Sequence, residues 1–414
     1  MKSIAAALDA ILALHPGPIG AERVTLEGAL GRVLAEAVTS PRALPPFDNS
    51  AMDGYALRLA DARPGAVLPI VDESAAGRPA ARPLGPGEAM RIFTGAPTPE
   101  GAELVVMQEL TERDGDRVTL SAELPPAEAR ANIRPRAGDV TAGAELLPAG
   151  ALIGPGEIGL LAACGRGRLS VRRRPRVAVI STGDELREIE DPLGPGQIVN
   201  SNAPTLAALV REAGGEPVVL PIVRDRSEDH ARAFAEGARC DLILTTGGVS
   251  VGDHDLVQPT LDRLGWRRAF WKVALKPGKP VLAGTLGAGG AVVLGLPGNP
   301  ASAMVTFELF ARPLIRRMQD HPRPFRRVIR RPLAGAMTKK PGRTHVLRGR
   351  LTAAGFSAPA PQGSGLLRSM VEVEALAFLA AERERFAAGD EVPVVELRHD
   401  GVAEPQPGLF TEVR

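Results

Sequence analysis

The 414-residue sequence predicts an α/β protein of several domains, organised around one parallel sheet. The main observation is an alternation of short apolar segments with helical segments that begins at Arg176, which is typical of parallel strands joined by helices. In addition, short strands separated by Gly/Pro turns are expected from Phe47 to about Asp139, and again over roughly the last 90 residues. The length also favours several domains, at about 150 residues each.

The N-terminal part of the chain is expected to be helical before the short strands begin. The spacing of apolar residues predicts a helix over residues 4–14, a Pro/Gly turn over 15–20 and a second helical stretch from Leu26. Short strands are then expected at residues 68–71, 104–108 and 117–120.

The α/β region is expected to hold four strands and three helices. The strands are residues 177–180, 218–223, 242–245 and 291–296. The helices are residues 203–213, 227–238 and about 301–318, and Asn202 is the expected N-cap of the first. Near the C-terminus, strands such as 345–351 and 391–397 predict a small β-barrel or sandwich.

Composition excludes several classes of protein. With 44% hydrophobic residues and a net charge of +2, the chain is neither disordered nor a charged nucleic-acid coat. No apolar segment approaches the roughly 20 residues that a membrane span needs, and the N-terminus does not resemble a signal peptide. Two cysteines, Cys164 and Cys240, cannot form a disulfide framework or a metal cluster of their own. We therefore expect a cytoplasmic protein without a nucleic-acid or membrane partner.

Two glycine-rich turns mark the expected ligand site. Residues 245–252 directly follow a strand, and residues 295–300 join a strand to the start of a helix. Ligands of open α/β sheets bind at the carboxyl ends of the strands. Glycines allow close approach of the backbone there, and exposed amides at a helix start suit a phosphate or a similar anion. One such turn also occurs in ordinary loops, whereas two at neighbouring strand ends favour a binding function.

Acidic residues follow the same strands. Asp184 and Glu185 follow the first strand, Asp225 the second, and Asp253 and Asp255 the glycine turn of the third. Any one of them could be an ordinary solvated loop residue. Because all of them are expected at one edge of the sheet, beside a phosphate, they indicate a Mg²⁺ site.

Three of the six lysines gather in one short segment of a chain that otherwise carries 44 arginines. They are Lys272, Lys276 and Lys279. Lysine is a compact point charge that suits a phosphate or another oxyanion, although a solvated surface is the alternative.

Further segments carry a family resemblance. They are residues 46–56 (PFDNSAMDGYA, with the single Tyr), 91–96 (RIFTGA), 181–186 (STGDEL), 200–202 (NSN), 246–255 (TGGVSVGDHD), 276–280 (KPGKP), 295–300 (GLPGNP), 342–343 and 362–365. Together they resemble the molybdopterin molybdenumtransferases of the MoeA type, which are related to the E domain of gephyrin. The match runs in order from about residue 1 to 400, and residues 46–56 are its most specific part.

The resemblance implies four domains. They are an elongated linker domain of residues 1–45 and 141–173, a β-rich lobe of 46–140, a molybdopterin-binding α/β domain of 174–323 and a C-terminal β-barrel of 324–414. It also implies a homodimer with the active site at the subunit interface, between the α/β domain of one subunit and the lobe of the other. An upstream molybdopterin adenylyltransferase would be a further partner.

The family's reaction takes adenylylated molybdopterin and molybdate as substrates, with Mg²⁺. It releases AMP and inserts molybdenum into the dithiolene, which gives molybdenum cofactor. The resemblance implies that catalysis is chiefly electrostatic positioning, without a protein nucleophile.

The resemblance assigns roles to residues of this sequence. Those expected to hold the cofactor are Ser181, Thr182, Gly183, Asn200, Asn202, Thr246, Gly247, Gly248, Val249, Ser250, Gly252, Lys279, Pro297, Gly298, Asn299, Arg343, Arg348, Ser364 and Ser369. Metal ligands are expected among Asp184, Glu185, Asp225, Asp253 and Asp255. The expected catalytic residues are Asp53, Thr94, Asp139, Glu185, Asp225, Asp255, Lys272 and Lys276. Asp53 and Thr94 would come from the partner's lobe, and the molybdate dianion would meet Lys272, Lys276, Arg343 and Ser364.

Two alternative functions stay open. A molybdopterin adenylyltransferase shares a similar α/β domain and its TGG turn, but it consists essentially of that domain alone. A non-catalytic scaffold would resemble the receptor-clustering use of gephyrin's E domain. The sequence departs from the family pattern at Glu103, Ala137, Val373 and Glu374, and it does not distinguish molybdate from tungstate.

Overall fold

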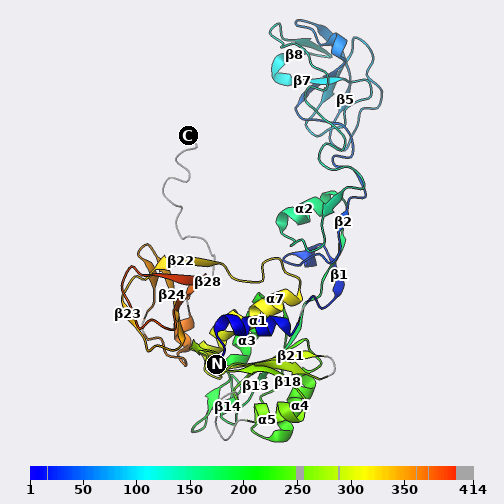
Figure 1. The fold of residues 1–414 in the computed structure, drawn as a ribbon. Helices are drawn as coiled ribbons and strands as arrows, with labels where there is room; N and C mark the ends of the chain where they lie inside the picture. The colour runs from blue at the N-terminus through cyan, green and yellow to red at the C-terminus, as the bar shows by residue number, and fades with distance from the viewer. Residues whose placement is uncertain (16, 249–255, 288–289, 360, 372, 398–414) are drawn as a thin grey trace. The chain divides into compact units, whose positions relative to one another are not determined.

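The structure of the protein is a computed structural model that describes residues 1–15, 17–248, 256–287, 290–359, 361–371 and 373–397. The chain forms two compact units, one of Met1–Glu22 with Arg172–Arg414 and the other of Arg23–Val171. Each unit has its own sheets and its own hydrophobic cores (Figure 1).

The larger unit contains a six-stranded sheet in the order β16-β13-β17-β21-β20-β18. Its parallel part consists of β13 (Arg176–Ser181), β16 (Glu216–Val219), β17 (Leu242–Thr246) and β21 (Ala291–Leu296). An antiparallel edge of β20 (Leu282–Leu286) and β18 (Arg267–Trp271) completes it. Every residue of β17 and β21 is buried, which is why these central strands stand out in the sequence as apolar segments. The parallel part confirms the predicted α/β class; the antiparallel edge was not predicted.

Helices cover both faces of this sheet, as Figure 1 shows. Val177 and Val179 of β13 pack into the core on one face, and Ala178 and Ile180 pack into the core on the other, as the alternation of a strand requires. The first face holds α1 (Ile4–Ala13), α3 (Asn202–Glu212), α6 (Pro300–Thr306), the π-helical segment η4 (Phe307–Ala311) and α7 (Arg312–Met318). The second face holds α4 (Ser227–Gly237) and α5 (Val257–Arg263).

Helix α1 has the predicted position in the sequence, and its environment is the α/β core. Ala7 and Ile11 are fully buried there, and the Lys2 amide donates to the Lys272 carbonyl at 3.1 Å. The first residues of the chain therefore pack with the α/β domain, while the domain boundaries inferred from the sequence stay a prediction.

Some local predictions were wrong. No α-helix starts at Leu26: only the 3₁₀ turn η1 (Glu27–Ala29) forms, because Gly28 weakens a helix and Gly31 adopts a φ of 72°. The cap of α3 is not Asn202, because Asn200 Oδ1 accepts from the Ala203 amide at 3.2 Å.

Two predicted element lengths also change. The second parallel strand ends at Val219, and Val223 adds only an isolated bridge to Thr182. The helix predicted over 301–318 is divided by the π-helical turn η4.

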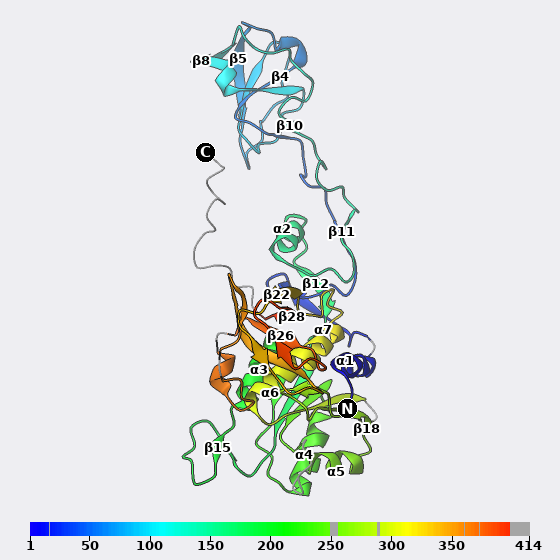
Figure 2. The ribbon, with the colours of Figure 1, turned by 60° about the vertical axis from the view of Figure 1, so that its left-hand side comes forward.

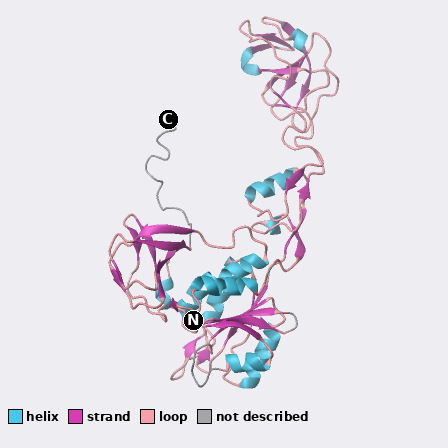
Figure 3. Ribbon diagram, in the orientation of Figure 1, coloured by secondary structure: helices cyan, strands magenta, loops and turns pink. Residues whose placement is uncertain are grey.

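The C-terminal part of the larger unit is a second sheet with a separate core (Figure 3). Its order is β19-β24-β26-β28-β22, and β25 pairs with β24. The strands are β19 (Leu275–Lys276), β22 (Val328–Pro332), β24 (Thr344–Thr352), β25 (Gly355–Ser357), β26 (Ala375–Leu379) and β28 (Glu391–Glu396), beside a separate pair of β23 (Met337–Thr338) and β27 (Arg385–Phe386) and the 3₁₀ helix η5 (Leu367–Met370). The edge strand β19 belongs to the lysine segment and runs parallel to β24.

The smaller unit is built from short strands, as predicted. Its main sheet has the order β7-β4-β6-β5-β9-β8. These strands are β4 (Gly54–Leu57), β5 (Val67–Ser74), β6 (Ala89–Ile92), β7 (Leu104–Met107), β8 (Thr111–Asp114) and β9 (Arg117–Leu120), with the 3₁₀ turns η2 (Leu59–Asp61) and η3 (Gln108–Leu110). Two-stranded pairs form between β1 (Ala21–Thr25) and β12 (Arg168–Arg172), β2 (Val38–Thr39) and β11 (Glu145–Leu147), and β3 (Asn49–Ser50) and β10 (Ile133–Arg134), beside helix α2 (Pro155–Ala163). Among the described residues, no helix has the length and apolar character to cross a membrane.

Candidate functional site

A pocket of about 440 Å³ lies at the carboxyl ends of β13, β17 and β21. Its lining consists of Thr182, Glu185, Leu186, Ile198, Val199, Asn200, Ser201, Asn202, Thr246, Gly247, Gly248, Pro280, Pro297, Gly298, Asn299 and Pro300. The structure therefore brings together the two glycine turns and the asparagines that the sequence singled out. The apolar wall, Ile198 and Val199 of β15 (Ile198–Val199), was missed; β15 pairs with β14 (Leu186–Arg187) in the projecting loop of Figure 2.

The two glycine turns touch through their backbones. Gly247 has a φ of 89°, and a Cβ there would lie 2.6 Å from the Thr182 carbonyl oxygen. A Cβ on Gly298 would lie 3.6 Å from the Gly247 Cα. Glycine is therefore required at 247, whereas a Cβ on Gly298 would be in ordinary van der Waals contact. The two turns lie close together at the strand ends, where exposed backbone amides can bind an anion.

Asparagines join the surrounding loops. Asn202 Nδ2 donates to the Gly298 carbonyl at 2.7 Å, so the residue predicted as a cap instead fixes the second turn. Asn299 Nδ2 donates to Ser364 Oγ at 3.1 Å, which connects the pocket to a loop of the C-terminal domain. Ser364 therefore lies beside the pocket, as expected, and Ser181 is buried next to Thr246.

The predicted acids form a pair at the same sheet edge. The Asp184 amide donates to Asp225 Oδ2 at 3.3 Å, and the Asp225 amide donates to Asp184 Oδ1 at 3.2 Å. Both side chains are exposed, and the Glu185 carboxylate folds over Gly183. No cluster of three metal-ligating side chains occurs among the described residues. Val249, Ser250, Gly252, Asp253 and Asp255 lie outside the described residues.

A buried histidine lies behind this pair. His230 Nε2 is 3.7 Å from Asp225 Oδ1, and only 1% of the residue is exposed. Burial lowers the pKa of His230, and the charge of Asp225 partly opposes that effect. His230 was not among the residues predicted for the site; it is buried on the inner face of α4.

The lysine segment lies at the junction of the two sheets rather than in the pocket. Lys276 and Lys279 are exposed, Lys272 adopts a φ of 74° and its Nζ lies 3.7 Å from the Trp271 ring centroid. None of the three lysines is among the described residues that line the pocket; Pro280 of the same segment is.

Cations of the C-terminal domain gather near this segment. The parallel pairing of β19 with β24 places Lys276 opposite His345. Burial, with the positive charges of Lys276, Lys339, Arg348 and Arg343, lowers the pKa of His345 to about 4. His345 is therefore neutral at pH 7, and the cations around it make this region electropositive.

Arg348 is the most unusual side chain of the region. It is fully buried, and its Nη2 donates to the Gly363 carbonyl at 3.0 Å. Its Nε and Nη1 have no hydrogen-bond partner within the described part of the chain, and burial lowers its pKa. Donors buried in this way are costly, so their persistence points to a ligand that satisfies them.

Ser369 is separated from the pocket. Its hydroxyl donates to the Leu366 carbonyl, and it lines a different cavity of about 700 Å³ in the C-terminal domain. The structure does not bring Ser369 into the lining of the pocket at the strand ends.

In the smaller unit, Asp53 and Thr94 form a rigid pair. Asp53 Oδ1 accepts from the Thr94 amide at 2.7 Å and from the Thr94 hydroxyl at 2.8 Å. These bonds, with the charge of Arg91, hold the pKa of Asp53 below its ordinary value. Gly54 is required beside them, because a Cβ would overlap the Val106 carbonyl.

The remaining predicted acid lies apart from this pair in the hydrogen-bond network. Asp139 is exposed, and its amide donates to the Leu44 carbonyl at 3.0 Å. No hydrogen bond among the described residues joins it to Asp53 or Thr94.

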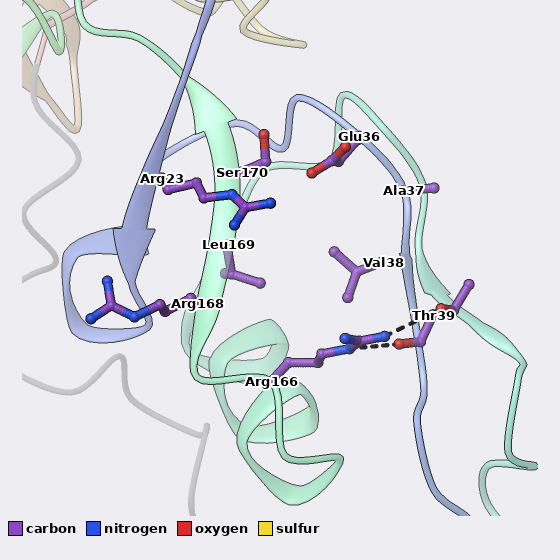
Figure 4. A pocket seen from close by; sticks show the side chains of 9 residues that line it. All are labelled: Arg23, Glu36, Ala37, Val38, Thr39, Arg166, Arg168, Leu169 and Ser170. Atoms are coloured by element: carbon purple, nitrogen blue, oxygen red, sulfur yellow. Dashed lines mark hydrogen bonds between the residues drawn. The ribbon is translucent and has the colours of Figure 1, made fainter.

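The smaller unit also has a depression of about 300 Å³ beside β12 (Figure 4). Arg166 on its wall is held by Thr39, through the carbonyl at 2.8 Å and the hydroxyl at 3.3 Å. Glu36 is the acidic residue among those that line the depression. No residue predicted from the sequence as functional lines this depression.

The parallel sheet, the paired glycine turns and the carboxylates at the strand ends define the class: a multidomain protein with an α/β ligand-binding domain. Family models match in the same order as the domains. They are the MoeA N-terminal region (domain I and II) at residues 2–165, the probable molybdopterin binding domain at 178–317 and the MoeA C-terminal region (domain IV) at 330–397. The chain belongs to the MoeA family.

Individual relatives support this assignment over nearly the whole length. The chain is 36% identical over 415 residues to a molybdopterin molybdenumtransferase of Haemophilus influenzae, covering 96% of this chain and 99% of that protein. It is 43% identical over 304 residues to a protein of the same name from Nostoc sp., covering 72% and 69%. A crystal structure of a molybdopterin biosynthesis MoeA protein from Pyrococcus horikoshii matches with a TM-score of 0.82 and 29% identity, over 96% of this chain and all of the other.

Proposed function

We propose that this chain is a transferase of molybdenum cofactor biosynthesis that inserts molybdenum from molybdate into adenylylated molybdopterin and releases AMP. One observation carries the proposal: a pocket formed by two glycine turns is joined, through Asn299 and Ser364, to a domain with the buried guanidinium of Arg348, whose Nε and Nη1 have no hydrogen-bond partner among the described residues. The names of the relatives, molybdopterin molybdenumtransferase, support the same activity.

The pocket would hold the phosphate end of the pterin substrate. The amides of Gly247 and Gly248 and the start of α6 after Asn299 supply donors for a phosphate without rearrangement. Ile198 and Val199 provide an apolar wall against which a flat ring system can lie.

Mg²⁺ fits the acid pair. Mg²⁺ in nucleotide sites takes one or two carboxylates, several waters and substrate oxygens, and Asp184 with Asp225 offers two exposed carboxylates. When bound, the ion would offset the negative charge of the phosphate groups. The protein's own part is to hold the two carboxylates next to the pocket.

The cations of the C-terminal domain would bind molybdate as the second substrate. Molybdate is a dianion, and positive charges that are shielded from water bind such an anion strongly. Arg348 has free donors for its oxygens, and Lys276 is exposed on the neighbouring edge strand. Catalysis in this arrangement is positioning and charge stabilisation.

A homodimer would complete the site. Asp53 is an exposed carboxylate that Thr94 holds in one orientation, as expected of a residue that acts on a ligand of another subunit. Mixing Asp53→Ala subunits with Asp184→Asn subunits tests this. If the site spans two subunits, half of the random dimers carry one intact site, and activity returns to about a quarter of the wild-type value. Well-folded mixed dimers without recovery would exclude the shared site.

The proposed reaction is tested by AMP release from adenylylated molybdopterin with Mg²⁺, with and without molybdate. Release that depends on molybdate supports the proposal. Adenylylation of free molybdopterin from ATP would instead identify an adenylyltransferase, and binding without either reaction would identify a scaffold.

A further inference from the structure

Two arginines outside the expected site hold the loop that carries Asp184. The Nη1 of Arg224 donates to the carbonyl oxygens of Asp184 at 3.1 Å and of Leu186 at 3.0 Å. The Nη1 of Arg187 donates to the same two oxygens, at 3.0 Å and 2.7 Å. Each carbonyl thus accepts from two guanidinium groups, and bonds from charged donors are the stronger kind.

These bonds join the loop that follows β13 to the loop that follows β16, beyond the point where the two strands stop pairing. The last backbone bond between the two chain segments runs from the Gly183 amide to the Val223 carbonyl at 3.0 Å. Arg224 follows directly and joins its own loop to the loop of Asp184. Asp225 is the next residue, so its position depends on the same attachment.

The acid pair needs such an attachment. Asp184 and Asp225 are bonded to each other only through long amide–carboxylate bonds of 3.2 and 3.3 Å. Two neighbouring carboxylates repel each other when no cation lies between them. Two guanidinium groups on the carbonyl oxygens of Asp184 and Leu186 fix the backbone from which Asp184 projects.

We propose that Arg224, together with Arg187, is a positioning residue that keeps Asp184 and Asp225 as a preformed pair for a divalent cation. The inference rests on the proposed function, because it takes the pair to be the Mg²⁺ site. Both arginines act through the main chain, because their Nη1 atoms are bonded to the carbonyl oxygens of Asp184 and Leu186. Residues that orient metal ligands in this way change metal affinity by about 10- to 100-fold when they are replaced.

The test is Mn²⁺ binding by the full-length protein, followed by the loss of the free Mn²⁺ signal in electron paramagnetic resonance. Arg224→Ala should weaken binding at least about tenfold. Arg224→Lys keeps the charge but not the planar donor group, so an intermediate affinity is expected. Arg226→Ala is the matched control, because Arg226 is exposed, lies two residues away and makes no side-chain hydrogen bond among the described residues. Its affinity for Mn²⁺ should equal that of the wild type.

The outcomes are distinguishable. Wild-type affinity in a folded Arg224→Ala protein would overturn the positioning role, and equal weakening by Arg226→Ala would show that only net charge matters. Should Arg224→Ala fail to fold, Arg224→Lys carries the same comparison. Asp184→Asn tests the site itself: if the wild type binds no Mn²⁺, or Asp184→Asn binds it normally, the cation site and this inference are both wrong. Molybdate-dependent AMP release, measured separately, would still stand.

In kinetics, the positioning role predicts a selective change. The Mg²⁺ concentration for half-maximal rate should rise at least about tenfold in Arg224→Ala, whereas the KM for molybdate should stay within about twofold. A purely structural loss would lower kcat without changing the Mg²⁺ requirement.

Discussion

Replacing Arg348 by methionine should make the substrate-free protein more stable and abolish its use of molybdate. The guanidinium has five donors, and among the described residues it has one hydrogen bond, to the Gly363 carbonyl. Two buried nitrogens without partners cost roughly 2–6 kcal/mol, and the loss of one charged hydrogen bond removes about 1.5–3 kcal/mol. The small cavity beside methionine reduces the remainder further. We therefore expect a gain of about 1–2 kcal/mol in the free energy of unfolding.

The assay is urea unfolding with and without molybdate. At a typical slope of about 2 kcal/mol per M, the midpoint of Arg348→Met should rise by roughly 0.5–1 M, and added molybdate should shift it no further. Molybdate should raise the midpoint of the wild type. Arg331→Met, at an exposed position on β22 of the same sheet, is the control and should leave both values unchanged. A lower midpoint in Arg348→Met would refute the reasoning, because the guanidinium would then be a structural group rather than one kept for a ligand.

Three further predictions concern pH and packing. His345 has a pKa of about 4 in the folded protein and about 6.5 when unfolded, so the unfolded state binds more protons between these pH values. The free energy of unfolding should therefore fall by up to roughly 3 kcal/mol as the pH drops from 6.5 to 4. His345→Gln should flatten that part of a plot of the urea midpoint against pH. Gly54→Ala should destabilise the smaller unit by about 2–4 kcal/mol, because the added Cβ overlaps a β7 carbonyl. Gly159→Ala in α2, where a Cβ would have nothing within 4 Å, should stabilise the same unit by about 0.5–1 kcal/mol. Equal thermal midpoints for the two variants would contradict this. Arg326→Met should lower the free energy of unfolding by about 1.5–3 kcal/mol, because it removes a 3.1 Å ion pair from the buried Glu308, which keeps Arg312 at 3.8 Å as a second partner. Adding Glu308→Gln should recover part of the loss in the same unfolding assay.

The sequence predicted the elements whose signal is local. Three of the four parallel strands, β13, β17 and β21, stand out because they are almost entirely buried and end at turns, whereas β16 is partly exposed and its bounds were predicted less well. Helix α1 stands out by its spacing of apolar residues. The helix predicted from Leu26 does not form, because Gly28 and Gly31 outweigh the apolar spacing.

For the site, local signals located the glycine turns and the acids at the strand ends, since parallel strands end at one edge. The pairing of Asp184 with Asp225 comes from the structure. The environment of Lys276 could not be predicted, because it depends on the long-range pairing of β19 with β24. The support from Arg224 was missed for a similar reason: its partners are main-chain oxygens of another loop, which no sequence pattern identifies.

In the proposed reaction, the pocket at the strand ends and the cations of the C-terminal domain act together. A crystal structure with AMP and molybdate, with molybdenum located by anomalous scattering, tests it most directly. We predict molybdenum within hydrogen-bond reach of the Arg348 guanidinium, and the nucleotide phosphate at the amides of Gly247 and Gly248. Molybdenum bound elsewhere, for example in the depression beside Arg166, with Nε and Nη1 of Arg348 still without a partner, would exclude this arrangement.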